Sequence, residues 1–165
     1  SLGTVLTIDK DANATFGTTN SIVGTATNND AVAGNIGENV ESYTSTYTNY
    51  TTTATYQAVD SITLTAGDWD VSATSQLTVG GTSVITNLLG AISTSNTSAS
   101  TTGSSCSSGY WYTQTVSVNQ YTNTGVCRVN ISSTTVYYLV ARIDYSTLGG
   151  ATWATDSFIR ARRMR

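Results

Sequence analysis

Residues 136–143 have the sequence VYYLVARI, and this stretch decides the fold class. Seven of its eight positions are β-branched, aromatic or otherwise apolar, with Arg142 as the exception. Such residues favour strands, and a strand that is apolar on both faces is typical of a sheet centre covered by two layers or by a subunit interface. We therefore predict that residues 136–143 form the central strand of the core.

Shorter runs on both sides of this stretch alternate between apolar and polar residues. Residues 62–65 alternate, Ala66 and Gly67 have turn character, and residues 69–73 resume with Trp69, Val71 and Ala73 on one face. The pattern predicts a hairpin. Further strands are expected at 77–79, 110–119 and 127–131, and a strand or single turn at 84–92. The hydroxyl-rich segment 93–105 has no apolar periodicity and is expected to be an exposed loop.

Composition and length limit the architecture to one domain with an appendage. The 165 residues include 33 Thr, 21 Ser and no Pro, and only 10% are charged. We predict an all-β, antiparallel sandwich of jelly-roll type over residues 35–165. Residues 1–34, where apolar residues are sparse, are predicted to be an extended N-terminal stem or arm and linker that needs a partner. A trimer is a natural way to bury such a stem.

Several classes of function are excluded by missing residue types. The chain has no His, which removes imidazole bases and nearly all His-based zinc sites, and Lys10 is its only Lys. A Ser or Thr nucleophile therefore lacks a base, and the glycines do not form a phosphate loop. No stretch approaches a membrane span. We expect no catalytic residue, cofactor, metal, membrane or nucleic-acid partner.

Charge is distributed unevenly along the chain. Residues 1–127 have eight acidic residues against Lys10, whereas residues 128–165 have six Arg against two Asp. The last arginines are predicted to pair with carboxylates of the same or a neighbouring chain. A polyanion site is the alternative, although no aromatic residues interleave with the bases. The candidate inter-subunit or charge-pairing residues are Arg160, Arg162, Arg163 and Arg165.

Cys106 and Cys127 are the only cysteines, and both flank predicted strands. They are a candidate disulfide across a 20-residue excursion, but two buried small residues or two unrelated thiols fit the sequence equally well. A bridge indicates an oxidising final environment, whereas reduced thiols fit cytoplasmic assembly.

Aromatic residues near the hydroxyl-rich segment form the candidate sugar-stacking surface. An aromatic ring offers a flat apolar face to a pyranose, and Ser and Thr hydroxyls exchange hydrogen bonds with its hydroxyl groups. The alternative is that alternate members of each aromatic run face the core or a neighbouring subunit. A second set, interleaved with Thr, has the same two interpretations and comprises Tyr43, Tyr47, Tyr50 and Tyr56. The candidate glycan-stacking residues are Tyr110, Trp111, Tyr112 and Tyr121.

Asp68 and Asp70 are the only close carboxylate pair on a predicted strand. Two residues apart, they share a face at roughly 6–7 Å, within the range of a glycosidase acid and base. The favoured interpretation is structural, with both residues solvating the outer face while Trp69 fills the core.

Four segments resemble motifs of bacteriophage fibre proteins. Residues 28–38, NNDAVAGNIGE, resemble the linker that opens a C-terminal domain common in these proteins. Residues 61–72, SITLTAGDWDVS, resemble the family's ISLTAGDWDVSG hairpin, and residues 158–165, FIRARRMR, its ARRxR ending. Residues 6–17, LTIDKDANATFG, are similar to IDKDGNATF stem repeats, with Ala12 in place of Gly. Ala73 likewise stands where the hairpin often has Gly.

The resemblance implies a non-enzymatic virion surface protein, a homotrimeric fibre or head decoration of a phage. On a tail it would bind a host receptor such as a cell-surface polysaccharide, and on a capsid it would contact other virion proteins. The motifs themselves are structural and carry over no catalytic residue. Two alternatives stay open, namely a tailspike-like polysaccharide depolymerase using Asp68 and Asp70, and a bacterial surface adhesin.

Overall fold

The computed structural model describes residues 6–8, 14–16, 31–44, 48–50, 52–78, 83–99, 106–111, 119–147, 149, 152–153 and 156–164. They form twelve strands and, within these ranges, no α-helix. The strands are β1 Leu6–Ile8, β2 Ala14–Phe16, β3 Asn39–Tyr43, β4 Thr48–Asn49, β5 Gln57–Leu64, β6 Gly67–Thr78, β7 Val84–Ser93, β8 Ser107–Trp111, β9 Gln120–Ile131, β10 Thr135–Thr147, β11 Thr152–Trp153 and β12 Phe158–Arg163.

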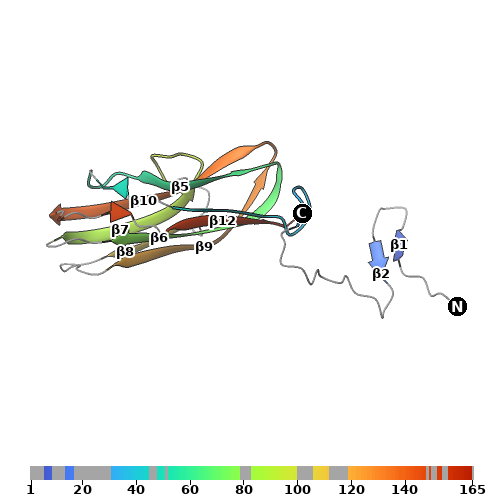
Figure 1. Cartoon of the computed structure of the whole chain (residues 1–165), viewed down its shortest axis with the longest axis horizontal. Helices are drawn as coiled ribbons and strands as arrows, with labels where there is room; N and C mark the ends of the chain where they lie inside the picture. Colours follow the sequence, from blue (N-terminus) through green and yellow to red (C-terminus); the bar gives the residue numbers. More distant parts are fainter. Residues whose placement is uncertain are drawn as a thin grey trace.

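Strands β3 to β12 form two antiparallel sheets (Figure 1). One sheet has the order β5-β10-β7-β8. The other has the order β3-β12-β6-β11-β4, and β9 pairs with the remaining edge of β6. Strands β1 and β2 make a separate two-stranded antiparallel sheet. The described chain is thus all-β and antiparallel, consistent with a β-sandwich.

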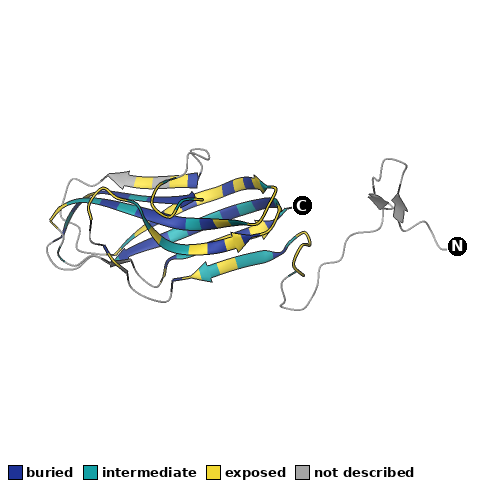
Figure 2. Cartoon of the chain, turned by 90° about the horizontal axis from the view of Figure 1, so that it is seen from above, coloured by how far each residue is buried: buried dark blue, intermediate teal, exposed yellow. Residues whose placement is uncertain are grey.

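The core lies between the two sheets and is built from alternate residues of each strand. Trp69, Val71 and Ala73 of β6 pack in one cluster with Leu139 of β10 and Ile159 of β12. A second cluster continues the core with Leu77, Leu88 and Ile143. Figure 2 shows the resulting alternation of buried and exposed residues along the strands. The period-2 pattern in the sequence therefore identifies the inward face correctly.

Strand β10 occupies the predicted central position, hydrogen-bonded to β5 on one side and β7 on the other. Its residues Leu139, Val140 and Ala141 are each 0% exposed, so both faces of this strand are buried at its middle. The prediction of a central strand is confirmed. Burial on both faces holds within a single chain at Val140, whereas Val136 at the start of the apolar run is 37% exposed. Residues 84–93 form strand β7, so of the strand and the single turn expected at 84–92 the structure has the strand.

The predicted hairpin between residues 62–65 and 69–73 is wrong. Both segments are strands, but β5 pairs with β10 and β6 pairs with β9 and β12, in different sheets. The chain crosses from one sheet to the other between Leu64 and Gly67. Because Leu64 and Trp69 are both fully buried, this crossing lets the two apolar faces meet across the core, which a flat hairpin would not allow.

Both open sides of the sandwich are closed by contacts between the sheets. On one side Ser42 of β3 donates a hydrogen bond to Asp60 Oδ1 of β5 at 2.8 Å. On the other, the structure joins Cys106, just before β8, to Cys127 of β9 through a disulfide with Cα atoms 5.3 Å apart. Both cysteines are buried in the larger core cluster. The sequence leaves open a disulfide, two buried small residues or two unrelated thiols, and the structure contains the disulfide.

Candidate functional site

Arg163 at the end of β12 joins three distant segments of the chain. Its Nε donates to Glu38 Oε2 at 2.8 Å, and its Nη atoms donate to Ala66 O at 2.8 Å and Thr65 Oγ1 at 2.5 Å. Its guanidinium lies 4.2 Å from the ring centre of Trp69. Among the predicted charge-pairing arginines, Arg163 therefore pairs within its own chain.

Gly67 and the linker lie close against these contacts of Arg163, which we call the joint. A Cβ at Gly67 would lie 2.0 Å from Arg163 Nη1, and its φ of +149° disfavours any other residue. Two backbone hydrogen bonds tie Arg163 to the linker, from Gly37 N to Arg163 O and from Arg163 N to Glu38 O, both at 2.9 Å. The buried arginine thus fixes the course of residues 34–38 against the sandwich.

The Glu38 carboxylate is ionised in this joint. Burial alone would raise its pKa, but hydrogen bonds from Gly34 N and Arg163, together with the Arg163 charge, outweigh burial and lower the pKa. Its side chain is 11% exposed and that of Arg163 is 5% exposed. The pair is therefore a buried ion pair whose two members depend on each other.

Acidification is expected to weaken the joint. Because the pKa of Glu38 is lower in the folded chain than its ordinary value of 4.5, its contribution to stability is present above about pH 4.5. That contribution is lost as the pH falls through the folded pKa. We expect the difference in free energy of unfolding between the wild type and Glu38→Gln to shrink as denaturation is measured from pH 7 toward pH 3. A difference that stays constant over this range would contradict the assignment.

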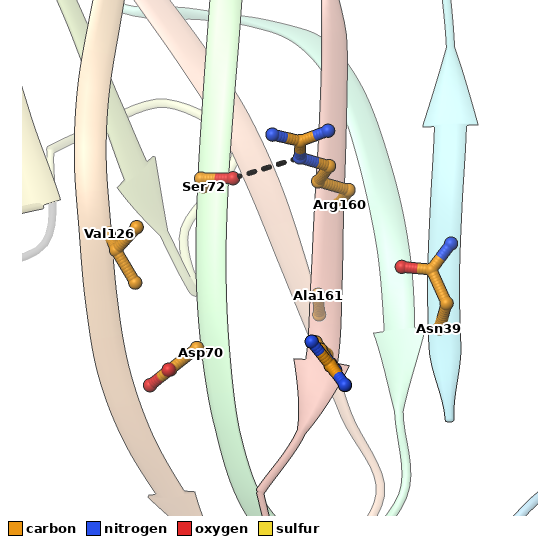
Figure 3. Close-up of a pocket in the computed structure, with 7 residues that line it drawn as sticks. Asn39, Asp70, Ser72, Val126, Arg160 and Ala161 are labelled. Atoms are coloured by element: carbon orange, nitrogen blue, oxygen red, sulfur yellow. Dashed lines mark hydrogen bonds between the residues drawn. The ribbon is translucent and has the colours of Figure 1, made fainter. Parts of the chain in front are cut away.

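The candidate functional site is a groove on the outer face of the sheet formed by β3, β12, β6 and β9 (Figure 3). We call it the sheet groove. It has a volume of about 330 Å³, and a second hollow of about 170 Å³ continues it along β9. The two hollows share Ser72, Val126 and Arg160. The sheet groove is lined by Asn39, Asp70, Ser72, Val126, Arg160, Ala161 and Arg162.

Small side chains at the middle of this face create the groove. The pairing of β6 with β9 shifts register between Ser72 and Thr74, and opposite this point Gly125 has φ +71°. Such a bulge places an extra residue in one strand and redirects its neighbours. Here Gly125 offers no side chain, and Val126 is left 63% exposed beside Ser72.

Longer side chains form the walls. Arg160 is exposed, donates from Nε to Ser72 Oγ at 3.3 Å, and holds its guanidinium 5.4 Å from the ring centre of Phe158. The Phe158 ring in turn lies 5.7 Å from that of Tyr43, which is 59% exposed at the sheet edge. Arg162, next along the same face, has Asp70 as its cross-strand neighbour.

The groove residues are suited to binding and not to covalent chemistry. Arginine donates hydrogen bonds but does not act as a base, so the hydroxyl of Ser72 has no activating partner in Arg160. Among the described residues, the ion pairs are Arg128–Asp68, Arg142–Asp144 and Arg163–Glu38. Arg160 and Arg162 belong to none of these pairs, so both guanidiniums can receive a ligand.

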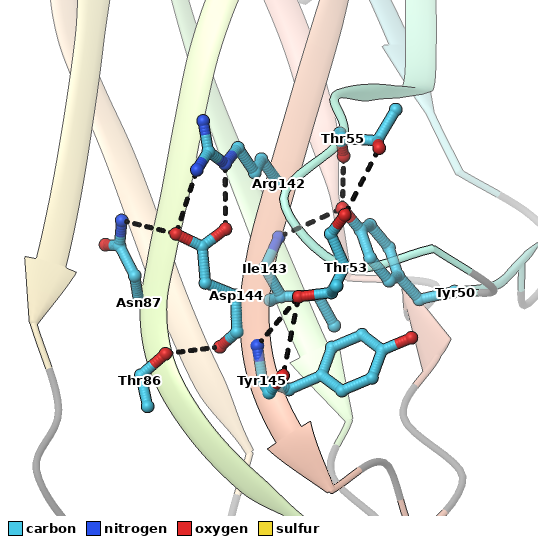
Figure 4. A network of polar contacts seen from close by, with 9 residues as sticks. All are labelled: Tyr50, Thr53, Thr55, Thr86, Asn87, Arg142, Ile143, Asp144 and Tyr145. Carbon is cyan, nitrogen blue, oxygen red and sulfur yellow. Dashed lines mark hydrogen bonds and ion pairs between the residues drawn. The ribbon is translucent and has the colours of Figure 1, made fainter.

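A second polar cluster lies on and beside β10, in the opposite sheet (Figure 4). Arg142 holds Asp144 through two hydrogen bonds of 2.8 and 2.9 Å, which lowers the Asp144 pKa despite partial burial. The Tyr50 hydroxyl bonds to Thr55 O and accepts from Ile143 N at 3.2 Å, and burial raises its pKa. These contacts fasten Tyr50 to β10 and to Thr55.

Asp68 and Asp70 point to one face, as predicted, but their surroundings differ. Asp68 is 3% exposed and accepts two hydrogen bonds from Arg128, at 2.9 and 2.6 Å. Asp70 is half-buried and lines the sheet groove. Because Arg128 occupies both carboxylate oxygens of Asp68, these contacts favour the structural interpretation of this residue.

The structure divides the predicted stacking residues between the two sheets. Tyr121 of β9 is 46% exposed, and its hydroxyl accepts from Gln76 on the face that carries the sheet groove. Tyr110 and Trp111 belong to β8 in the other sheet, and the structure describes their backbone but not their side chains. Tyr112 and Arg165 lie outside the described residues altogether. Of the second aromatic set, Tyr50 is buried in the core.

Several residues of the sheet groove could not be predicted from the sequence. Asn39, Ser72 and Val126 come from three strands, and only cross-strand register brings them together. A usable signal was the alternation of Arg160 and Arg162 with buried Ile159 and Ala161, which places both arginines on the outer face.

The described residues include no helix long and apolar enough to cross a membrane and no group of three or more potential metal ligands. Comparison of the chain with protein-family models, with curated proteins and with solved structures finds no match.

Proposed function

We propose that this chain is a non-enzymatic structural protein of a bacteriophage particle, a surface fibre or capsid decoration that assembles as a homotrimer and attaches to a glycan on the host surface. Its place is the virion surface, and its other partners are capsid or tail proteins. The proposal starts from the resemblance of its linker, its 61–72 segment and its C-terminal ending to phage fibre motifs.

One structural observation carries the proposal. The three resembling segments, which lie far apart in sequence, meet at Arg163: the linker contributes Glu38, the second segment contributes Thr65, Ala66 and Trp69, and the ending contributes Arg163 itself. If the three short segments resembled the phage motifs by chance, we would not expect all three to contact one buried side chain. Their meeting supports a shared structural origin for the motifs.

We further propose that the sandwich is of jelly-roll type. Its strands pair as a series of nested partners: β7 with β8, β6 with β9, β5 with β10, and β3 with β12. A long hairpin wrapped on itself in this way yields two four-strand-wide sheets, an arrangement common in viral capsid and lectin domains. The strand orders of the two sheets support this topology.

A bacterial surface adhesin is a second candidate, with which the Cys106–Cys127 disulfide is equally compatible. Such bridges persist in oxidising environments, where both adhesins and released virions function. A processed secretory precursor in the source cell would favour the adhesin, whereas recovery of the chain from purified particles would favour the virion protein.

The native molar mass tests the proposed assembly directly. We expect light scattering to give a mass of about three 17.3 kDa chains that persists after brief exposure to mild denaturant. A stable monomer at micromolar concentration would contradict the trimer. Antibodies against the purified chain should also decorate intact particles; particles that stay undecorated would contradict the virion surface assignment.

A further inference from the structure

We propose that the sheet groove binds an acidic polysaccharide, with a uronic acid carboxylate held by Arg160 and Arg162 and the adjoining sugar rings lying over Val126. This inference rests on the proposed function, because it assigns the ligand class and the surface through which the particle would attach to a host glycan.

The two arginines form a matched pair of donors. They alternate on β12 with the buried residue Ala161, so both point to the outer face with Cα atoms roughly 7 Å apart. Both are exposed, and neither belongs to an ion pair of the described residues. The planar guanidinium donates two parallel hydrogen bonds to a carboxylate, a geometry that lysine does not provide.

The local charge complements an acid. The sheet groove is lined by two arginines and one aspartate, whereas the whole chain has a net charge of −3. The positive excess belongs to the lining alone, since Glu41, which lies opposite Arg160 on β3, is not among the lining residues. Asp70, at one side of the groove, provides an acceptor for sugar hydroxyl groups.

The shape of the sheet groove favours an extended sugar chain over a single sugar ring. The two hollows are continuous because they share Ser72, Val126 and Arg160, and their volumes of about 330 and 170 Å³ together reach the size of ordinary ligand sites. The second hollow adds Thr74, Asn123 and Phe158. Hydroxyl and amide groups beside an exposed apolar side chain match the alternating polar edges and apolar faces of pyranose rings.

Asp70 and Glu41 argue against a nucleic acid as the ligand. Asp70 is the cross-strand neighbour of Arg162, and Glu41 is that of Arg160. A nucleic-acid backbone carries a phosphate at every nucleotide and would meet both carboxylates. A polysaccharide with one carboxylate per disaccharide can place that carboxylate between the arginines and keep its neutral sugars beside Asp70 and Glu41.

The experiment is a calorimetric titration of the full chain with three probes, namely hyaluronate, unsulfated chondroitin and heparosan oligosaccharides, each of which carries one carboxylate per disaccharide. The carboxyl-reduced form of each is the matched neutral ligand, and a thymidine oligonucleotide tests for general polyanion binding. The variants are Arg160→Gln, Arg162→Gln and both together. Lys10→Gln is the control, since it removes the same charge from the predicted stem.

We expect at least one acidic probe to bind, and each arginine substitution to weaken binding about tenfold or more. Carboxyl reduction is expected to weaken binding by a similar factor, and Lys10→Gln to leave it unchanged. Thermal unfolding of Arg160→Gln and Arg162→Gln should match the wild type, because both side chains are exposed.

Four results would overturn the inference: no binding of any acidic probe, equal binding of the carboxyl-reduced form, arginine variants that bind like the wild type, or an oligonucleotide that binds as tightly as the best sugar. Native molar mass measured on the same samples separates this inference from the proposed function. A three-chain mass without uronate binding overturns only the ligand assignment, and a binding-competent monomer overturns only the trimer.

Discussion

Replacing Arg163 with Met is expected to lower the free energy of unfolding by about 3–5 kcal/mol, the cost of removing one member of a buried ion pair. The substitution leaves the Glu38 carboxylate buried without its cation and removes the hydrogen bonds to Thr65 and Ala66. For a chain of this size the melting temperature should fall by roughly 6–20 °C. Denaturant and thermal unfolding at one fixed protein concentration measure both quantities.

The matched control is Arg162→Met, since Arg162 is the neighbouring residue on β12 but is exposed and has no ion pair among the described contacts. We expect it to change stability by no more than about 0.5 kcal/mol. Combining Glu38→Gln with Arg163→Met should cost less than the two single effects added together, because no buried charge is then orphaned. An Arg163→Met variant as stable as Arg162→Met would refute the role of the joint.

Removing the disulfide with Cys106→Ala and Cys127→Ala is expected to cost about 3 kcal/mol. The bridge spans 21 positions of sequence and ties the end of one sheet to the edge of the other, so its loss mainly increases the entropy of the unfolded chain. The melting temperature should fall by roughly 6–12 °C. Chemical denaturation of the oxidised wild type, the reduced wild type and the double variant measures the effect.

Each single variant provides the control for this prediction. Either substitution alone breaks the covalent link, so the single and double variants should agree to within about 1 kcal/mol. Reductant should also act slowly on the folded chain, because Cys106 and Cys127 are 3% and 0% exposed. Equal stability of the oxidised and reduced wild type would show that the bridge does not support the fold.

The strands and their inward faces follow from the sequence because a buried sheet face imposes a period of two. Trp69, Val71 and Ala73 were assigned to one face on this basis, and all three lie in the core. The doubly buried middle of β10 was likewise visible as an uninterrupted apolar run. Local pattern is sufficient here because burial is decided residue by residue.

Strand pairing could not be predicted in the same way. A turn between two alternating strands fits a hairpin within one sheet and a crossing between two sheets equally well, and the crossing at residues 65–66 is decided by distant partners in β10 and β12. The nested pairing of β3 with β12 is a long-range property that no local signal encodes. This is the physical reason that the predicted hairpin was wrong.

Only part of the candidate site could be predicted from the sequence, for a related reason. The alternation on β12 separates Arg160 and Arg162, which face outward, from Arg163, yet nothing local shows that Arg163 meets Glu38 from the start of the domain. The aromatic character of Tyr121 predicts a stacking residue, and this residue lies on the face of the sheet groove. Val126 lines the groove because of a bulge that only the pairing of β6 with β9 defines.

The pairing of the first strand of the sandwich with the last has a consequence for biosynthesis. Glu38 and Arg163 are 125 positions apart, so the sandwich cannot close until Arg163 has left the ribosome. Contacts of such long range are slow to form, and an all-β domain dominated by them folds on the slow side of single domains. Until β12 arrives, β3 and β6 both present unpaired edges that can pair with other nascent chains. The long-range pairing that completes the domain therefore makes loss of β12 a route to aggregation.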